Sequence, residues 1–319
     1  MGTRKGLVVL MGPTKDKERT LERNAIFGML AFFALTLLIG TFCDEGLAHA
    51  LFSPGNVPAT FVTTLGIYPF FSAVVLFLGV VFERVLHGGM GKVGKVVACL
   101  VAAALALVVS FIGAAALVDG DCLGGIFPNL IRNYPVIAGI DLVCVCPLFY
   151  LGFRLAANTE DKLLLKRVLG LLAIMVAAFV FMRLTKNIFN RPRFRSVALG
   201  YPGVEFVPWY KISPDPSDLM AQYGLERGEF SSFPSGHAIL SSSVIYILFS
   251  LSWVMHALKD KRVQLCVGGF VFACVIMFTR MVLGAHYLSD VSMGAIVGLV
   301  FTLLYLFVQR RISESQQAA

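Results

Sequence analysis

The stretch FPSGHAILSSSVIYILFSL, residues 233–251, places a Ser, a Gly and a His directly before a run of mostly apolar residues. Such a run is typical of a helix within a membrane, because helices in lipid satisfy their own backbone hydrogen bonds over about 20 apolar residues. The titratable imidazole of His237 therefore lies at the mouth of an apolar helix. Polar groups at such depths are costly and tend to be functional.

The composition extends this interpretation to the whole chain. Of the 319 residues, 57% are hydrophobic and 14% are charged, and the mean hydropathy is +0.80. These values indicate a membrane-embedded protein. The apolar runs cover Asn24–Phe42, Thr64–Phe82, Lys95–Leu117, Val136–Gly152, Leu169–Lys186, His237–His256, Val263–Leu283 and Val291–Val308. The expected fold is all-α, a polytopic membrane helical bundle of about eight transmembrane helices.

The first apolar run follows a basic stretch and no small-residue cleavage site separates it from a soluble domain, so we expect a retained helix and not a removed signal peptide. The seven cysteines include no CxxC pair and no spacing typical of zinc. Cys43 and Cys122 fall in loops on the same predicted side. A disulfide between them and two free thiols are both compatible with the sequence.

The distribution of basic residues predicts the orientation. Most of the 27 Lys and Arg residues lie in segments that share a side with both termini. The other side has short acidic or neutral loops and one long segment, 187–236, rich in Pro, Asp, Ser and Gly. The positive-inside rule therefore predicts a multi-pass protein of the plasma or inner membrane, with cytoplasmic termini and the long segment outside as an ordered cap with one short helix.

The net charge of +8 therefore reflects the orientation of the protein in the membrane. No basic run is interleaved with aromatic residues, so we expect no nucleic-acid partner. The expected partners are the bilayer and a membrane lipid.

The first of three polar clusters is RLTKNIFNRPRF, residues 183–194, at the end of the fifth apolar run. It carries Lys186, Arg191 and Arg193. These residues are suited to binding an anion, and interfacial snorkelling is the alternative interpretation.

The second cluster is PSGH, residues 234–237. A Ser–Gly turn before a helix leaves backbone N–H groups without intrahelical partners, and such an end attracts phosphate. The alternative is a simple N-cap by Ser235 with an incidental histidine.

The third cluster is TRMVLGAHYLSD, residues 279–290. Arg280 closes the seventh run, and His286 and Asp290 have the i, i+4 spacing that places them on one face of a helix. Asp290 would then hold the imidazole of His286 as a nucleophile or base. A buried hydrogen-bonded pair is the alternative.

All three clusters fall at the same predicted end of the bundle, and this coincidence favours a single site. Cations and N–H donors neutralise the charge of a phosphoryl group, one imidazole attacks phosphorus, and another protonates the leaving oxygen. The sequence shows no carboxylate cluster for Mg²⁺, no Gly-rich phosphate loop and no G-x-S-x-G turn. We therefore expect neither a metal nor another cofactor.

These residues resemble the type-2 phosphatidic acid phosphatase (lipid phosphate phosphatase) superfamily. Its signature is K-x6-R-P, P-S-G-H and S-R-x5-H-x3-D, and the corresponding parts here read KNIFNRPRF, PSGH and TRMVLGAHYLSD. The resemblance covers about Leu169–Val308. It implies that His286 is a nucleophile that forms a phosphohistidine, Asp290 its orienting partner and His237 the acid and base. It also implies phosphate binding by Lys186, Arg193, Ser235, Gly236 and Arg280.

Two residues depart from the signature: Phe194 replaces a Pro and Thr279 replaces a Ser. We expect both to be tolerated. The family core has six spans, so two helices are additional. The expected division is a cytoplasmic segment 1–23, N-terminal transmembrane helices 24–168, a phosphatase core 169–308 that includes loop 187–236, and a cytoplasmic tail 309–319.

The resulting hypothesis is a metal-independent lipid phosphatase acting at the outer membrane face. Its substrate would be a polyprenyl diphosphate, phosphatidylglycerol phosphate or phosphatidic acid. One alternative is a lipid or anion transporter or flippase, for which inverted repeats and broken midplane helices are typical. A phosphotransferase that uses the same site is another.

Overall fold

The structure is a computed structural model that describes residues 13–131, 133–186 and 188–317. In these residues it contains helices and no strands. The long helices are α1 (Pro13–Leu51), α3 (Tyr68–Leu86), α4 (Lys92–Leu117), α6 (Tyr134–Ala157), α7 (Leu164–Thr185), α12 (Arg262–Val282) and α13 (Leu288–Gln317). The short ones are α2 (Val57–Thr64), α5 (Leu123–Ile126), η1 (Pro128–Leu130), α8 (Phe194–Val197), α9 (Ser217–Tyr223), η2 (Arg227–Phe230), α10 (Gly236–Ser242), α11 (Val244–Leu251) and η3 (His256–Leu258).

The predicted membrane bundle is confirmed. In the described part of the chain, seven helices are long and apolar enough to cross a membrane, and α10 and α11 form a shorter apolar segment. Large apolar side chains remain exposed on the outer helices, for example Leu100 of α4 and Leu142 of α6. Lipid tails, unlike water, accommodate such surfaces, so the protein is a multi-pass membrane protein.

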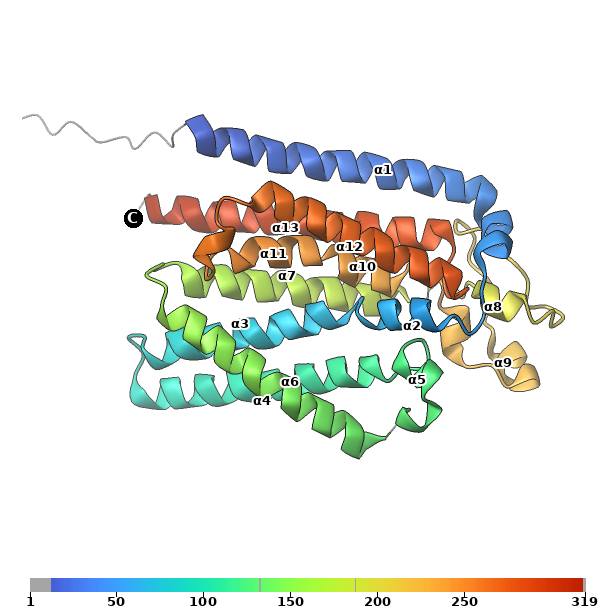
Figure 1. Cartoon of the computed structure of the whole chain (residues 1–319), viewed down its shortest axis with the longest axis horizontal. Helices are drawn as coiled ribbons and strands as arrows, with labels where there is room; N and C mark the ends of the chain where they lie inside the picture. Colours follow the sequence, from blue (N-terminus) through green and yellow to red (C-terminus); the bar gives the residue numbers. More distant parts are fainter. Residues whose placement is uncertain (1–12, 132, 187, 318–319) are drawn as a thin grey trace, which may run out of the picture.

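The shorter segment occupies the centre of one half of the bundle, beside α7, α12 and α13 (Figure 1). Nearly all residues of α10 and α11 are buried. The predicted helix His237–His256 was therefore too long, because α11 ends at Leu251. A helix covered by protein does not need the length that lipid imposes on an exposed one.

Glycines allow α13 to approach α10 closely. A Cβ atom on Gly294 would lie 2.6 Å from the carbonyl oxygen of Ser235, and one on Gly298 would lie 2.6 Å from Cβ of Ser242. This contact fixes the beginning of α10 against the first turns of α13, at the end of the bundle where the polar motifs lie.

The segment that joins α7 to α10 lies at that end of the bundle and carries α8 and α9 (Figure 1). From residue 188 onward this segment contains α8, α9 and η2, where one short helix was expected. Cys43 and Cys122 are both free. Residues 1–12 of the predicted N-terminal segment and 318–319 of the tail lie outside the described residues, and the division at residue 168 stays a prediction.

Close helix packing yields a first test. A Cβ atom on Gly152 of α6 would lie 1.9 Å from the carbonyl oxygen of Leu76 in α3. We expect Gly152→Ala to destabilise the protein by about 1–3 kcal/mol, because the backbones would have to separate. Thermal or denaturant unfolding in detergent measures this. Gly139→Ala on the same helix is the control, since nothing lies within 4 Å of that position, and equal stability of both variants would contradict the packing argument.

Candidate active site

The three polar motifs meet at one end of the bundle, as the sequence predicts. The first follows the end of α7, the second begins α10, and the third joins α12 to α13. They surround a cavity of about 530 Å³. Its polar lining includes Lys186, Arg193, Gly236, His237, Arg280 and His286, and its apolar lining includes Ile67, Phe71, Ile112, Phe179 and Leu240.

Two arginines of the predicted phosphate site are buried in this cavity. Arg193 is 9% exposed and Arg280 is 1% exposed. Both donate to one oxygen of Asp121, Oδ2, at 2.6 Å. Arg195 donates to the other oxygen of the same carboxylate, and its guanidinium also pairs with Glu229. The cations are therefore partly neutralised by an acid from the loop between α4 and α5.

Several strong donors in the same place have no partner. Nε of Arg193, Nε and Nη1 of Arg280, and Nε2 of His237 are buried without a hydrogen-bond partner among the described residues. Buried donors are usually satisfied, and guanidinium groups have no acceptor capacity. This set therefore points to an anionic ligand with several acceptor oxygens.

Lys186 completes the group of cations. Its Nζ donates to the backbone carbonyl of Ser231 at 2.9 Å. Burial of the ammonium group, together with Arg193 and Arg280 nearby, lowers the pKa of Lys186 to about 7. Its charge therefore changes near neutral pH, unlike that of the arginines.

His286 is buried and its two ring nitrogens have different surroundings. Nδ1 lies 2.7 Å from the carbonyl oxygen of Ser232 and 3.7 Å from Oδ2 of Asp290. A carbonyl can only accept, so Nδ1 carries the proton and Nε2 keeps its lone pair. Burial lowers the pKa of His286 to about 3, with Lys186 and Arg280 adding to this effect against the opposing influence of Asp290. The imidazole is neutral and able to act as a nucleophile.

Asp290 is held by a network of its own. Its Oδ2 accepts from the hydroxyl of Ser232 and, at 2.8 Å, from the backbone N–H of Tyr287. Its Oδ1 accepts from Arg191, which is 0% exposed. The nearest acceptor for His286 is thus the Ser232 carbonyl, and Asp290 fixes the same segment through the Ser232 hydroxyl.

Arg191 and Arg193 make different contacts although they are two residues apart. Arg191 donates to Asp44 of α1 at 2.9 Å, as well as to Asp290, and its guanidinium lies 4.2 Å from the ring centre of Tyr287. Asp44 also accepts from the backbone N–H of Ser289 at 2.9 Å. Arg191 therefore connects α1 to the start of α13, while Arg193 faces the cavity.

The residues of the second motif also differ in their roles, since one has a structural contact and the next lines the cavity. The hydroxyl of Ser235 accepts from the backbone N–H of Ala238 at 3.4 Å, and the N–H of Ser235 donates to the carbonyl of Asp290. Ser235 thus caps α10 and is not among the residues that line the cavity. Gly236 does line it, and a Cβ there would lie 3.3 Å from Cε of Lys186.

Both departures from the signature have structural partners. Phe194 is buried with its ring centre 5.3 Å from that of Phe52, at the end of α1. The hydroxyl of Thr279 lies 2.7 Å from that of Thr63 in α2. Both contacts connect the motifs to helices on the N-terminal side, which explains why an aromatic ring and a threonine are accommodated.

The fold and the site together define a class: a helical membrane protein with a cavity lined by arginines, a lysine and two histidines. The PAP2 superfamily matches residues 167–313. The match covers somewhat less than half of the chain and supports membership of the type-2 phosphatidic acid phosphatase superfamily, which the motifs indicated. This family generally comprises phosphatases, which supports phosphoester hydrolysis as the class of reaction.

Another similar protein is the Klebsiella pneumoniae "Uncharacterized 22.5 kDa protein in cps region", which is 28% identical over 95 residues. The match covers 29% of this chain and 44% of that relative, so the chain spans less than half the relative's length. No solved structure matches the chain.

Some residues of the site could not be found from the motifs. Asp44, Asp121 and Thr63 come from segments before the family match, and Arg195 lies just beyond the first motif. The one available signal for Asp121 was its acidic loop on the same predicted side as the cations. No group of three or more His, Cys, Asp or Glu that could hold a metal occurs among the described residues.

The buried network gives a second prediction. Asp44→Asn removes one of the two carboxylates that neutralise Arg191, and we expect a loss of about 3 kcal/mol in the free energy of unfolding. Denaturant titration of the purified protein measures it. Glu45→Gln changes the same charge at the next, exposed position and should leave the stability within about 0.5 kcal/mol. Similar values for the two variants would contradict a structural role for Asp44.

Proposed function

We propose that this protein is a metal-independent lipid phosphatase that cleaves a phosphomonoester or diphosphate of a membrane lipid through a phosphohistidine. The observation that carries the proposal is the group of unpartnered donors on Arg193, Arg280 and His237 beside the neutral imidazole of His286. Such donors stabilise the charge that develops on the oxygens of a transferring phosphoryl group.

In the first step, Nε2 of His286 attacks phosphorus and the bond from phosphorus to the leaving oxygen breaks. His237 gives its proton to that oxygen, so the lipid departs as an alcohol, or as a monophosphate when the substrate is a diphosphate. The carbonyl of Ser232 accepts the Nδ1–H of His286 and stabilises the positive charge on the ring, with Asp290 3.7 Å away.

In the second step, His237, now without its proton, takes one from a water molecule. The resulting hydroxide attacks phosphorus, the bond from nitrogen to phosphorus breaks, and inorganic phosphate leaves. Both histidines return to their initial state. An alcohol in place of water would give phosphotransfer with the same residues, so the acceptor decides between the two reactions.

The cavity favours a substrate with an anionic head and an apolar tail. Its lining combines the cations with apolar residues of α3, α4 and α7, among them Phe71, Ile112 and Phe179. Polyprenyl diphosphates, phosphatidylglycerol phosphate and phosphatidic acid share this chemistry. The distribution of Lys and Arg supports an outer-face site in the plasma or inner membrane, with both termini in the cytoplasm.

Phosphate release tests the proposal directly. We expect the purified protein in detergent to release phosphate from at least one of these lipids with EDTA present, and His286→Ala to lower the rate by about 10³ or more. His87→Ala, in the exposed turn after α3, is the control and should keep the wild-type rate. Absence of release from every lipid, or full activity of His286→Ala, would contradict the mechanism.

The titration of Lys186 predicts how kcat/KM changes on the alkaline side of its pH profile. The pKa of Lys186 is lowered to about 7, so its positive charge is complete below that pH and is lost above it. We expect kcat/KM to fall more steeply above pH 7, because this loss of charge adds to the loss of the His237 proton that the first step requires. His286 is already neutral throughout this range and does not contribute to the fall.

Lys186→Arg provides the comparison, because arginine stays protonated at all accessible pH values. The alkaline fall should become less steep above pH 7 in this variant, even if its maximal rate is lower. Profiles of kcat/KM between pH 5 and 9 measure the effect, and an unchanged alkaline limb would assign it to another group.

A further inference from the structure

The carboxylate of Asp121 occupies donors that a substrate phosphate would need. Its Oδ2 accepts from Nη1 of Arg193 and Nη2 of Arg280, both at 2.6 Å, and its Oδ1 accepts from Arg195. Guanidinium groups bind carboxylate and phosphate oxygens through the same charge-assisted N–H···O bonds. The carboxylate of Asp121 is therefore an anionic side chain located among the cations of the proposed site.

Asp121 is ionised in this position. Burial alone would raise the pKa of its carboxyl group, but attraction to Arg193, Arg280 and Arg195 outweighs burial and holds the pKa well below its usual value. A phosphate group that enters the cavity therefore meets a like charge beside the donors it requires. One anion must leave these donors before the other can take them.

We infer that Asp121 is a specificity-determining residue: it competes with the substrate phosphate for Arg193 and Arg280, and only a dianionic or more highly charged head displaces it. This inference rests on the proposed function. A phosphodiester carries a single negative charge, no more than the carboxylate, and Asp121 is tethered at the site. Phosphodiester lipids, which make up much of a bilayer, are thereby excluded, whereas terminal phosphates and diphosphates are admitted.

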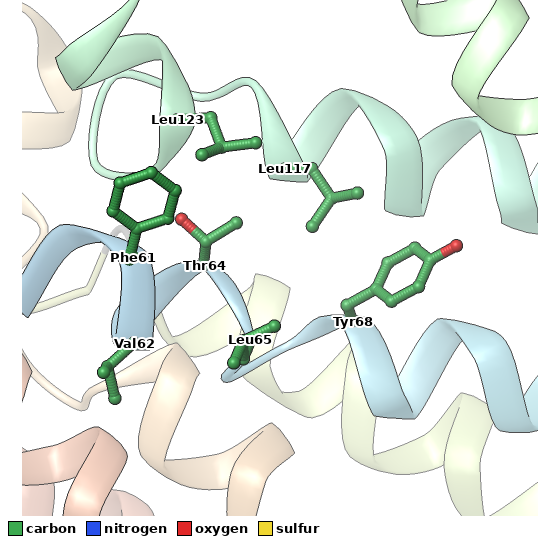
Figure 2. Close-up of a pocket in the computed structure, with 7 residues that line it drawn as sticks. All are labelled: Phe61, Val62, Thr64, Leu65, Tyr68, Leu117 and Leu123. Atoms are coloured by element: carbon green, nitrogen blue, oxygen red, sulfur yellow. The ribbon is translucent and has the colours of Figure 1, made fainter. Parts of the chain in front are cut away.

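A second cavity, of about 400 Å³, is lined by Leu117 and Leu123, which flank the loop that carries Asp121. Figure 2 shows Phe61 and Thr64 pointing across this cavity towards the side of the two leucines, whereas the ring of Tyr68 points to one side of them. The cavity therefore provides free space next to the loop.

Inhibition constants of the full-length protein in detergent test the inference. The competing ligands are phosphatidylglycerol, a monoanionic phosphodiester, and inorganic phosphate. We expect Asp121→Asn to lower the inhibition constant of phosphatidylglycerol at least tenfold and that of inorganic phosphate by a clearly smaller factor, and equal factors for the two ligands would overturn the assigned specificity. The control is Glu205→Gln, which removes the charge of an exposed acid in the segment that joins α7 to α10 and is not among the residues lining the cavity, and it should behave as wild type. Unchanged or higher constants in Asp121→Asn would overturn the inference and make Asp121 a residue that only positions the arginines.

A measurement on the wild-type protein covers the case in which Asp121→Asn does not fold. Hydrogen exchange of the loop 118–126 should become several-fold faster when orthovanadate binds, because the carboxylate leaves the arginines. Slower or equal exchange would overturn the inference.

Failure of the proposed function has a different signature. It would appear as absence of phosphate release from all lipids by the wild type. In that case calorimetry with inorganic phosphate still compares wild type and Asp121→Asn. Tighter binding by the variant supports competition at the arginines, and equal or weaker binding overturns it.

Discussion

A buried guanidinium that needs two carboxylates organises the site. Arg191 is fully buried and pairs with Asp44 of α1 and Asp290 of α13. A charge without partners in this position would be strongly unfavourable, so the two acids must stay in place wherever Arg191 is buried. Because Asp290 also binds the Ser232 hydroxyl, the network fixes the carbonyl that accepts from His286. The orientation of the proposed nucleophile thus depends on a helix outside the family match.

The site separates cations that are fully paired from cations that are not. Arg191 has a carboxylate on two sides and further contacts with Val207 and Ser289, and it is not among the residues that line the cavity of the site. Arg193 and Arg280 share one carboxylate oxygen, and each keeps at least one donor without a partner. Full pairing suits a structural role, since nothing remains to bind a ligand. Partial pairing suits binding, because the remaining donors are already oriented and desolvated when an anion arrives.

Hydropathy and short motifs predicted much of this molecule, for a physical reason. Lipid imposes a length and a polarity on each helix that are visible within a single window of sequence, and the motif residues lie within a few positions of helix ends. Partners distant in sequence have no such local signal. Asp44 lies 147 residues before Arg191, and Asp121 lies 159 residues before Arg280. Only the packing of α1 and of the loop after α4 brings these acids to the cations.

Local spacing also could not separate the roles of neighbouring residues. Ser235 was predicted to bind phosphate, and the structure shows its hydroxyl capping α10 while Gly236, the next residue, lines the cavity. The predicted hydrogen bond from His286 to Asp290 follows from helical spacing, but His286 precedes α13, which begins at Leu288. The turn before that helix directs Nδ1 to the carbonyl of Ser232 instead.

The same electrostatic requirement explains why an acid lies among the cations of a site for anions. A membrane protein that gathers Lys186, Arg193 and Arg280 at one buried place must compensate their charge while no substrate is bound. Asp121 supplies that compensation for the arginines, and the lowered pKa of Lys186 reduces the remaining charge. A site that is stable without substrate needs its positive charges compensated, whereas a site that binds an anion needs those charges available. A carboxylate on a short loop meets both, since it neutralises the arginines and can still give way to a group of higher charge.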